Sequence, residues 1–131
     1  MNELIKRQLD VLRGEFPKAE AIDRSDGTAL VVIPEFPLPT GWSARTTTIR
    51  FLAPVQYPIA QPDCFWADRE LLLEGHRTPQ STNISEVPGP LCSHPSGPYL
   101  WFSWHVQGWD PNRSSLKSYA RVISNRFDQR Q

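Results

Sequence analysis

Three regularly spaced prolines constrain the fold of this chain more than any other sequence feature. They lie in FLAPVQYPIAQPDCFW, residues 51–66, at Pro54, Pro58 and Pro62, with Tyr57 directly before the second. Proline sets its own φ and disfavours the helical conformation in the residue before it. By proline content alone this would be an ordinary loop. Its position after a β-rich run and before the aromatic residues 64–66 instead predicts a stiff, extended connection between two strands.

An amphipathic helix is predicted over residues 2–14. Asn2 can cap its start, and Gly14 and Pro17 end it. The spacing of its apolar residues, mostly three to five positions, places them on one face. These residues are Leu4, Ile5, Leu9, Leu12 and Phe16.

A second helix is predicted near the end of the chain. Asp110 followed by Pro111 suits a capping residue and the first helical position. The apolar residues after it follow the i, i+3, i+4, i+7 and i+11 pattern, so this helix should pack on a sheet. They are Leu116, Tyr119, Ala120, Ile123 and Phe127.

We call residues 51–66, with their three regularly spaced prolines, the proline segment. Three strands are predicted between the first helix and this segment, near residues 19–24, 28–33 and 44–52. A Ser-Asp-Gly turn at residues 25–27 separates the first two. Residues 34–42 contain three prolines, which lack a backbone donor, so we expect a wide hairpin loop there. Phe36 and Trp42 in this loop are candidate partner-binding residues. Together these patterns indicate an α+β domain.

Composition narrows the possible functions. A chain of 131 residues suits a single domain, residues 1–131, and its 14 basic and 14 acidic residues favour neither nucleic acid nor anionic membrane. Neither a long apolar run nor a signal-peptide core is present, so a cytoplasmic location is expected. In that compartment Cys64 and Cys92 should be reduced rather than joined as a disulfide.

The order of these parts resembles the ubiquitin-conjugating enzymes. The motifs that carry the resemblance are YPIAQP, GPLCS and WDP, in that order, and FSWH before WDP is similar to bacterial relatives from operons that encode ubiquitin-like conjugation. The resemblance implies their fold: an N-terminal helix, a four-stranded antiparallel meander, a long active-site loop and a C-terminal helix. It also implies structural roles for five motif residues, namely Tyr57, Pro58, Pro62, Trp109 and Pro111.

Cys92 is the candidate nucleophile. It lies in EVPGPLCSHPSGP, where proline and glycine exclude a helix and make a reachable cysteine more plausible than in a core strand. The resemblance implies that the thioester forms in this region, although the spacings from Pro62 and to Trp109 are longer than is usual in the family. The alternative is a non-catalytic loop cysteine.

Two histidines are candidates for tuning the thiol or accepting a proton. His94 follows Cys92 by two residues, and His105 would share a face with Trp101 if LWFSWH is extended. Each has a structural alternative, a loop histidine for His94 and a histidine bonded to backbone for His105. The eukaryotic His-Pro-Asn tripeptide is missing, and Asn83 is a weak substitute for its asparagine.

Other chemistries have less support. Cysteine and histidine are present, but no Cys-x-x-Cys or His-x-x-x-His pair predicts a metal site, and Cys64 should be buried in its strand. A Cys–His hydrolase would need an oxyanion hole that the sequence does not reveal. Without a glycine-rich phosphate loop, the chain is not expected to activate a substrate with ATP, and no cofactor is predicted.

The resemblance therefore implies a transferase that receives a ubiquitin-like protein from an adenylating activating enzyme and passes it to an amine. A JAB-type peptidase would be a further member of such a pathway. Anti-phage defence is one role that the pathway could serve. The first helix is the expected docking face for the activating enzyme, through Lys6, Arg7 and Arg13. A non-catalytic variant that only binds the ubiquitin-like protein is the competing interpretation.

Overall fold

The structure, a computed structural model, describes residues 1–83 and 99–131. Two helices and six strands form in these ranges. In chain order they are α1 (Glu3–Arg13), β1 (Glu20–Asp23), β2 (Ala29–Pro37), β3 (Thr46–Ala53), β4 (Phe65–Ala67), β5 (Thr82–Asn83), β6 (Leu100–Phe102) and α2 (Leu116–Asp128). Among the described residues no helix is long and apolar enough to cross a membrane.

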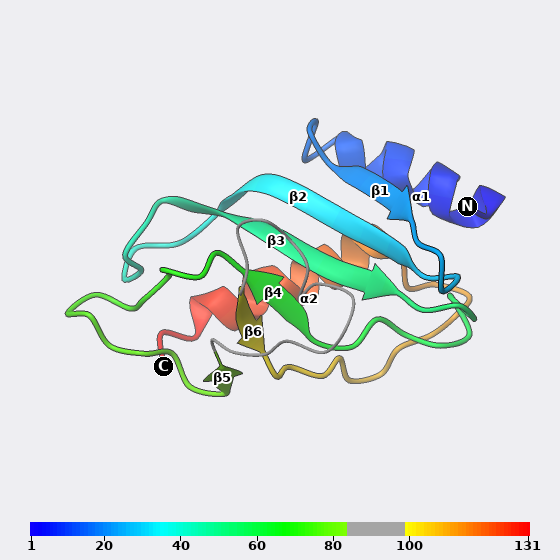
Figure 1. Ribbon diagram of the computed structural model, residues 1–131. Helices are drawn as coiled ribbons and strands as arrows, with labels where there is room; N and C mark the ends of the chain where they lie inside the picture. The colour runs from blue at the N-terminus through cyan, green and yellow to red at the C-terminus, as the bar shows by residue number, and fades with distance from the viewer. Residues whose placement is uncertain (84–98) are drawn as a thin grey trace.

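The strands form one antiparallel sheet in the order β1-β2-β3-β4-β6-β5. The strands β1 to β4 lie side by side in the order in which they occur in the chain. The predicted four-stranded meander and α+β fold are therefore confirmed. β6 extends this sheet by pairing with β4, where Trp66 stands opposite Trp101. In Figure 1, α2 runs along one face of the sheet and α1 lies beside β1 at its edge. The chain after β6 therefore begins next to the chain around β4.

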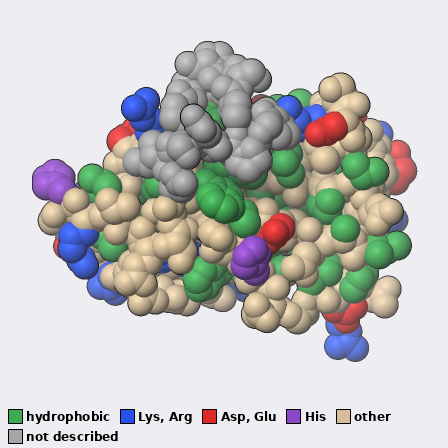
Figure 2. Space-filling view, turned by 60° about the horizontal axis from the view of Figure 1, so that its bottom comes forward, with side chains coloured by type: hydrophobic (Ala, Val, Ile, Leu, Met, Phe, Trp, Pro, Cys, Tyr) green, Lys and Arg blue, Asp and Glu red, His purple; other side chains and the backbone are tan. Residues whose placement is uncertain are grey.

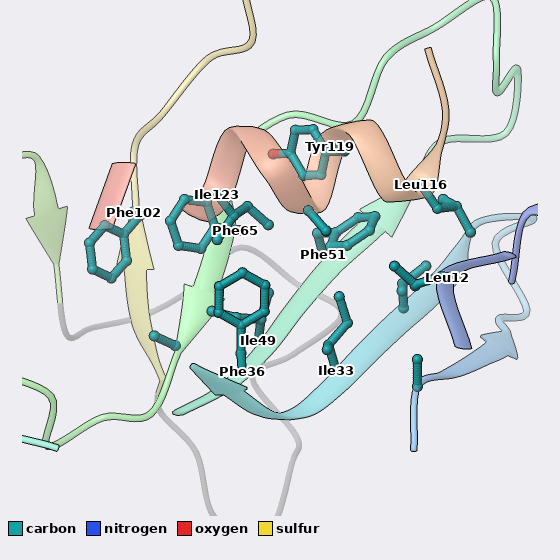
Figure 3. Close-up of a cluster of buried hydrophobic side chains, with 14 of the residues drawn as sticks. Leu12, Ile33, Phe36, Ile49, Phe51, Phe65, Phe102, Leu116, Tyr119 and Ile123 are labelled. Carbon is teal, nitrogen blue, oxygen red and sulfur yellow. The ribbon is translucent and has the colours of Figure 1, made fainter. Parts of the chain in front are cut away.

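The main core lies between the sheet and α2, and aromatic rings pack with aliphatic side chains there (Figure 3). Phe65 of β4 stacks on Phe102 of β6 with ring centroids 4.7 Å apart, and Phe127 of α2 meets both rings edge-on. Tyr119 packs against Phe51 of β3 at 4.8 Å. All five predicted apolar positions of α2 are buried, which confirms its amphipathic pattern.

The alternation expected for LWFSWH holds over β6. Leu100 and Phe102 point into the main core, whereas Trp101 packs with Trp66 and Tyr99 in a smaller cluster. Regular strand pairing ends at Phe102. His105 therefore follows the strand rather than belonging to it.

Both helices begin with a capping side chain. The Asn2 side chain accepts a hydrogen bond from the Ile5 backbone at 2.7 Å, as predicted. The start predicted for α2 at Asp110 and Pro111 needs correction, because Ser115 and Ser118 form a capping box and the helix begins at Leu116. Asp110 caps a preceding turn instead, accepting from the Asn112 backbone at 2.9 Å.

The loop predicted at residues 34–42 also needs correction, because β2 continues to Pro37 and Phe36 pairs with Thr47. The strand has a register shift between Ile33 and Phe36, where Glu35 has a φ of 58°. This shift accommodates the prolines, which have no backbone N–H to donate to the neighbouring strand. Phe36 and Trp42 are only 1% and 5% exposed.

These two aromatic residues consequently cannot serve as partner-binding residues. Phe36 stacks on Phe16 of the segment after α1, with ring centroids 5.2 Å apart. The Trp42 indole donates a hydrogen bond to the Phe127 carbonyl at 2.8 Å. Both side chains belong to the core that holds α2 on the sheet.

Gln8 of α1 connects the proline segment to α2. Its side-chain oxygen accepts hydrogen bonds from the Tyr57 hydroxyl and, at 3.1 Å, from the Leu116 backbone. The Tyr57 ring lies 5.9 Å from that of Trp109, whose indole donates to the Pro58 carbonyl at 2.8 Å. The two proline-containing motifs of the sequence, YPIAQP and WDP, thus contact each other and are anchored to both helices.

Truncation of Tyr57 should destabilise this junction. Tyr57 is 4% exposed, so Tyr57→Ala should lower the free energy of unfolding by about 3 kcal/mol or more, as other buried aromatic truncations do. Denaturant unfolding measures the change. Val55→Ala is the matched control, because Val55 lies in the same connection but is 64% exposed and should have little effect. Equal stabilities for the parent and Tyr57→Ala would contradict this role.

Candidate functional site

Asp63, Cys64 and His105 form the most concentrated group of reactive side chains among the described residues. One donor atom from each lies within 4.8 Å of the others. The His105 Nδ1 and the Asp63 Oδ1 are 2.5 Å apart. Asp63 and Cys64 lie at the end of the proline segment, just before β4, and His105 lies just after β6. The pairing of β4 with β6 therefore brings the three residues close together.

Cys64 is held from two sides by hydrogen bonds to its backbone. Its amide donates to the Trp104 carbonyl at 3.2 Å, and its carbonyl accepts from the Tyr119 hydroxyl at 2.8 Å. Cys64 has a φ of 62°, in the left-handed region that residues with a side chain rarely adopt. Such a conformation persists only where the surrounding structure stabilises it, and here the core residue Tyr119 helps to do so.

His105 and Asp63 face solvent, with 59% and 57% of their side chains exposed. They lie on an open groove of about 710 Å³ between the proline segment and the Trp-Asp-Pro motif. Ile59, Trp109 and Pro111 line other parts of this groove. Figure 2 shows one face of the molecule, on which a histidine lies beside an acidic side chain, with hydrophobic side chains nearby. A substrate in the groove would therefore reach His105 directly.

Cys64 lies below this surface and is only 6% exposed. Burial raises the pKa of its thiol, and the negative charge of Asp63 raises it further. Hydrogen bonds from the Trp104 backbone and the Trp101 side chain oppose part of this effect. Because the thiolate is the reactive form, Cys64 is a poor nucleophile in this setting.

The predicted site residues divide into three groups. Cys92 and His94 lie outside the described residues. His105 is described, and its partner is the carboxylate of Asp63 rather than a backbone group. Lys6, Arg7 and Arg13 are all exposed on α1. Of these cations, Lys6 pairs with Glu3 at 3.3 Å and Arg13 donates to the Ala19 carbonyl at 2.8 Å.

Sequence reasoning missed Asp63 and Gln8. Asp63 is separated from His105 by 42 positions, and only the pairing of β4 with β6 brings them into contact. The one available signal was an ionisable residue placed directly between Pro62 and the strand. Gln8 gave no signal, because a polar residue on an amphipathic helix is expected to face water.

The family that matches residues 12–130 is described as Prokaryotic E2 family E. The chain belongs to this family. The match spans the sheet, the Asp63–His105 pair and all of α2, so the resemblance found in the sequence motifs is confirmed at the level of the family. No curated protein and no solved structure matches the chain.

Membership in an E2 family gives the protein a ubiquitin-conjugating-like role in general terms. Proteins of this kind work with a ubiquitin-like protein and an activating enzyme, so these are its general partner classes. Within the described part of this E2 protein, the Asp63–His105 pair lies exposed on its groove, where a bound molecule could contact it.

The buried thiol should react slowly and only at high pH. In a Cys92→Ala variant, which leaves a single cysteine, alkylation of Cys64 should show a midpoint above the ordinary thiol value of about 8.5. Asp63→Asn should lower that midpoint, because it removes the negative charge that opposes ionisation. The measurement is the rate of iodoacetamide labelling against pH by mass spectrometry. A midpoint below that of a free thiol would contradict the described environment.

Proposed function

We propose that this E2-family protein is a transferase that carries a ubiquitin-like protein as a thioester on Cys92 and passes it to an amine. The observation that supports it best is the pairing of exposed His105 with Asp63 on an open groove. This arrangement supplies a proton acceptor at a surface wide enough for a side chain of another protein. Cys92 is proposed as the nucleophile from its sequence setting and the family.

Two acyl transfers make up the proposed reaction. The Cys92 thiolate attacks the thioester carbonyl on the activating enzyme, forms a new carbon–sulfur bond and releases the thiolate of that enzyme. An amine then attacks the Cys92 thioester, forms an amide and releases the Cys92 thiolate. The attacking amine must lose a proton in this second step, and a nearby base accelerates it.

His105 is the proposed base for the second transfer. The Asp63 carboxylate lies 2.5 Å from one ring nitrogen and would hold the ring in place while the other nitrogen accepts the proton. The apolar groove residues Ile59 and Trp109 would contact the carbon chain of a lysine-like acceptor. His94 is the second candidate for this role, from its sequence distance to Cys92.

The remaining partners are also proposals. The exposed cations of α1, Lys6, Arg7 and Arg13, would contact the activating enzyme, and Phe36 and Trp42 have no part in this docking. A JAB-type peptidase would act in the same pathway. The competing function is a non-catalytic protein of the same fold, which the missing His-Pro-Asn tripeptide favours.

One experiment distinguishes a protein that carries the ubiquitin-like protein as a thioester from one that only binds it. With the activating enzyme, the ubiquitin-like protein and ATP, the parent should form an adduct on a gel that a reducing agent removes. Cys92→Ala should abolish this band, whereas Cys64→Ser should retain it, because Cys64 is buried. A band that survives Cys92→Ala would overturn the assignment of the nucleophile. A parent that binds the ubiquitin-like protein without an adduct would favour the non-catalytic function.

Loss of the base should affect discharge more than loading. His105→Ala should slow transfer from the preformed thioester to free lysine by roughly 100-fold or more, the usual contribution of general acid–base catalysis. His94→Ala is the rival variant, and His76→Ala is the control, because His76 is exposed outside the groove. A change of only a few-fold in His105→Ala would remove His105 from the catalytic step. Single-turnover discharge kinetics measure these rates.

A further inference from the structure

Asp63, Cys64 and His105 combine three kinds of donor atom at one point of the fold. A carboxylate oxygen, a sulfur and a ring nitrogen lie within 4.8 Å of one another. We propose that these three residues bind a zinc ion. The proposal goes beyond the conjugating function and does not depend on it.

The local backbone explains how adjacent residues reach the same point. In a regular strand, Asp63 and Cys64 would point to opposite faces of the sheet. Cys64 instead adopts a left-handed conformation just before β4 begins, which interrupts this alternation. The carboxylate and the sulfur can then both approach the ring of His105, which enters from the chain after β6.

The distances suit a small ion after a modest adjustment. Zinc bonds of about 2.0–2.3 Å place the donor atoms of a tetrahedral site roughly 3.3–3.7 Å apart. The Asp63 and His105 atoms, now 2.5 Å apart, would separate slightly to admit the ion, and donor atoms near the 4.8 Å limit would move closer together. Both side chains are more than half exposed, so they are free to make this movement. Cys64 is the fixed member, because hydrogen bonds to Trp104 and Tyr119 hold its backbone.

The donor set favours zinc over magnesium and calcium. Magnesium and calcium prefer oxygen ligands, whereas a thiolate with an imidazole and a carboxylate suits zinc. Three protein ligands leave the fourth position of a tetrahedral ion for water. The groove beside Asp63 and His105 supplies solvent on that side, while Cys64 closes the site from below.

A bound ion would change what His105 can do. A ring nitrogen that coordinates zinc cannot also accept a proton, and the Asp63 carboxylate would then be shared with the metal. Zinc-loaded protein should consequently lack a free Asp63–His105 pair on the groove. This makes metal occupancy a means of controlling the groove, whichever reaction takes place there.

Zinc binding is tested directly on the purified chain, without a conjugation partner. The Cys92→Ala, His94→Ala double variant serves as background, so that the other thiol and its neighbouring histidine cannot supply ligands. After removal of metal with a chelator, this protein should bind one zinc ion per chain in competition with a chromophoric indicator. Failure to compete for zinc would overturn the proposal.

Ligand variants identify the residues that bind. In that background, His105→Ala and Asp63→Asn should each weaken zinc binding by about 100-fold or more, since even residues behind the ligands change affinity 10–100-fold. His76→Ala, which removes an exposed histidine elsewhere, should leave binding unchanged. Undiminished binding in His105→Ala or Asp63→Asn would overturn the assignment.

Cobalt provides a test that reports sulfur ligation itself. Co²⁺ bound at the site should show a thiolate-to-metal charge-transfer band in the near ultraviolet, which Cys64→Ser should remove. Circular dichroism checks that this variant is folded. If it is not, the spectrum of the Cys92→Ala, His94→Ala background decides, because a cobalt complex without the thiolate band there contradicts the Cys64 ligand.

Discussion

A hydrogen bond from the core helps to hold the backbone conformation on which the candidate site depends. The Tyr119 hydroxyl reaches from α2 through the main core to the carbonyl of Cys64 at 2.8 Å. Burial of this phenol raises its pKa, so the hydroxyl remains a donor across the physiological range. The same tyrosine packs on Phe51 of the sheet, so the site inherits its geometry from the packing of α2 on the sheet.

The sheet and the two helices contribute to the site in different ways. Pairing of β4 with β6 brings the chain segments of Asp63 and His105 together, although they are far apart in the sequence. Gln8 joins α1 to both the proline segment and the start of α2. The groove between the proline segment and the Trp-Asp-Pro motif therefore has walls attached to separate secondary-structure elements.

Local patterns predicted the parts of the fold that depend on local physics. The periodicity of Leu116 to Phe127 and the cap at Asn2 correspond to the helices observed, because amphipathic spacing and capping act within a few residues. Proline content misled at Phe36, since a register shift can accommodate prolines that a regular ladder would exclude. Sequence alone does not show where such a shift occurs.

The candidate site was only partly predictable for a related reason. His105 was identifiable as an ionisable residue in an aromatic segment, and the order of motifs indicated the family. Its contact with Asp63 depends on strand pairing across a long stretch of chain, which periodicity does not encode. The position of Cys92 relative to these residues falls outside the described part of the chain.

At Cys64, the residue that would best suit the left-handed backbone differs from the residue that supplies a sulfur atom. Glycine adopts this conformation without the steric cost of a side chain, so on backbone grounds alone it would be the better residue there. Glycine would also remove the sulfur. Random substitution followed by selection for thermal resistance alone should enrich glycine or asparagine at this site, whereas selection for a function that uses the sulfur should retain cysteine.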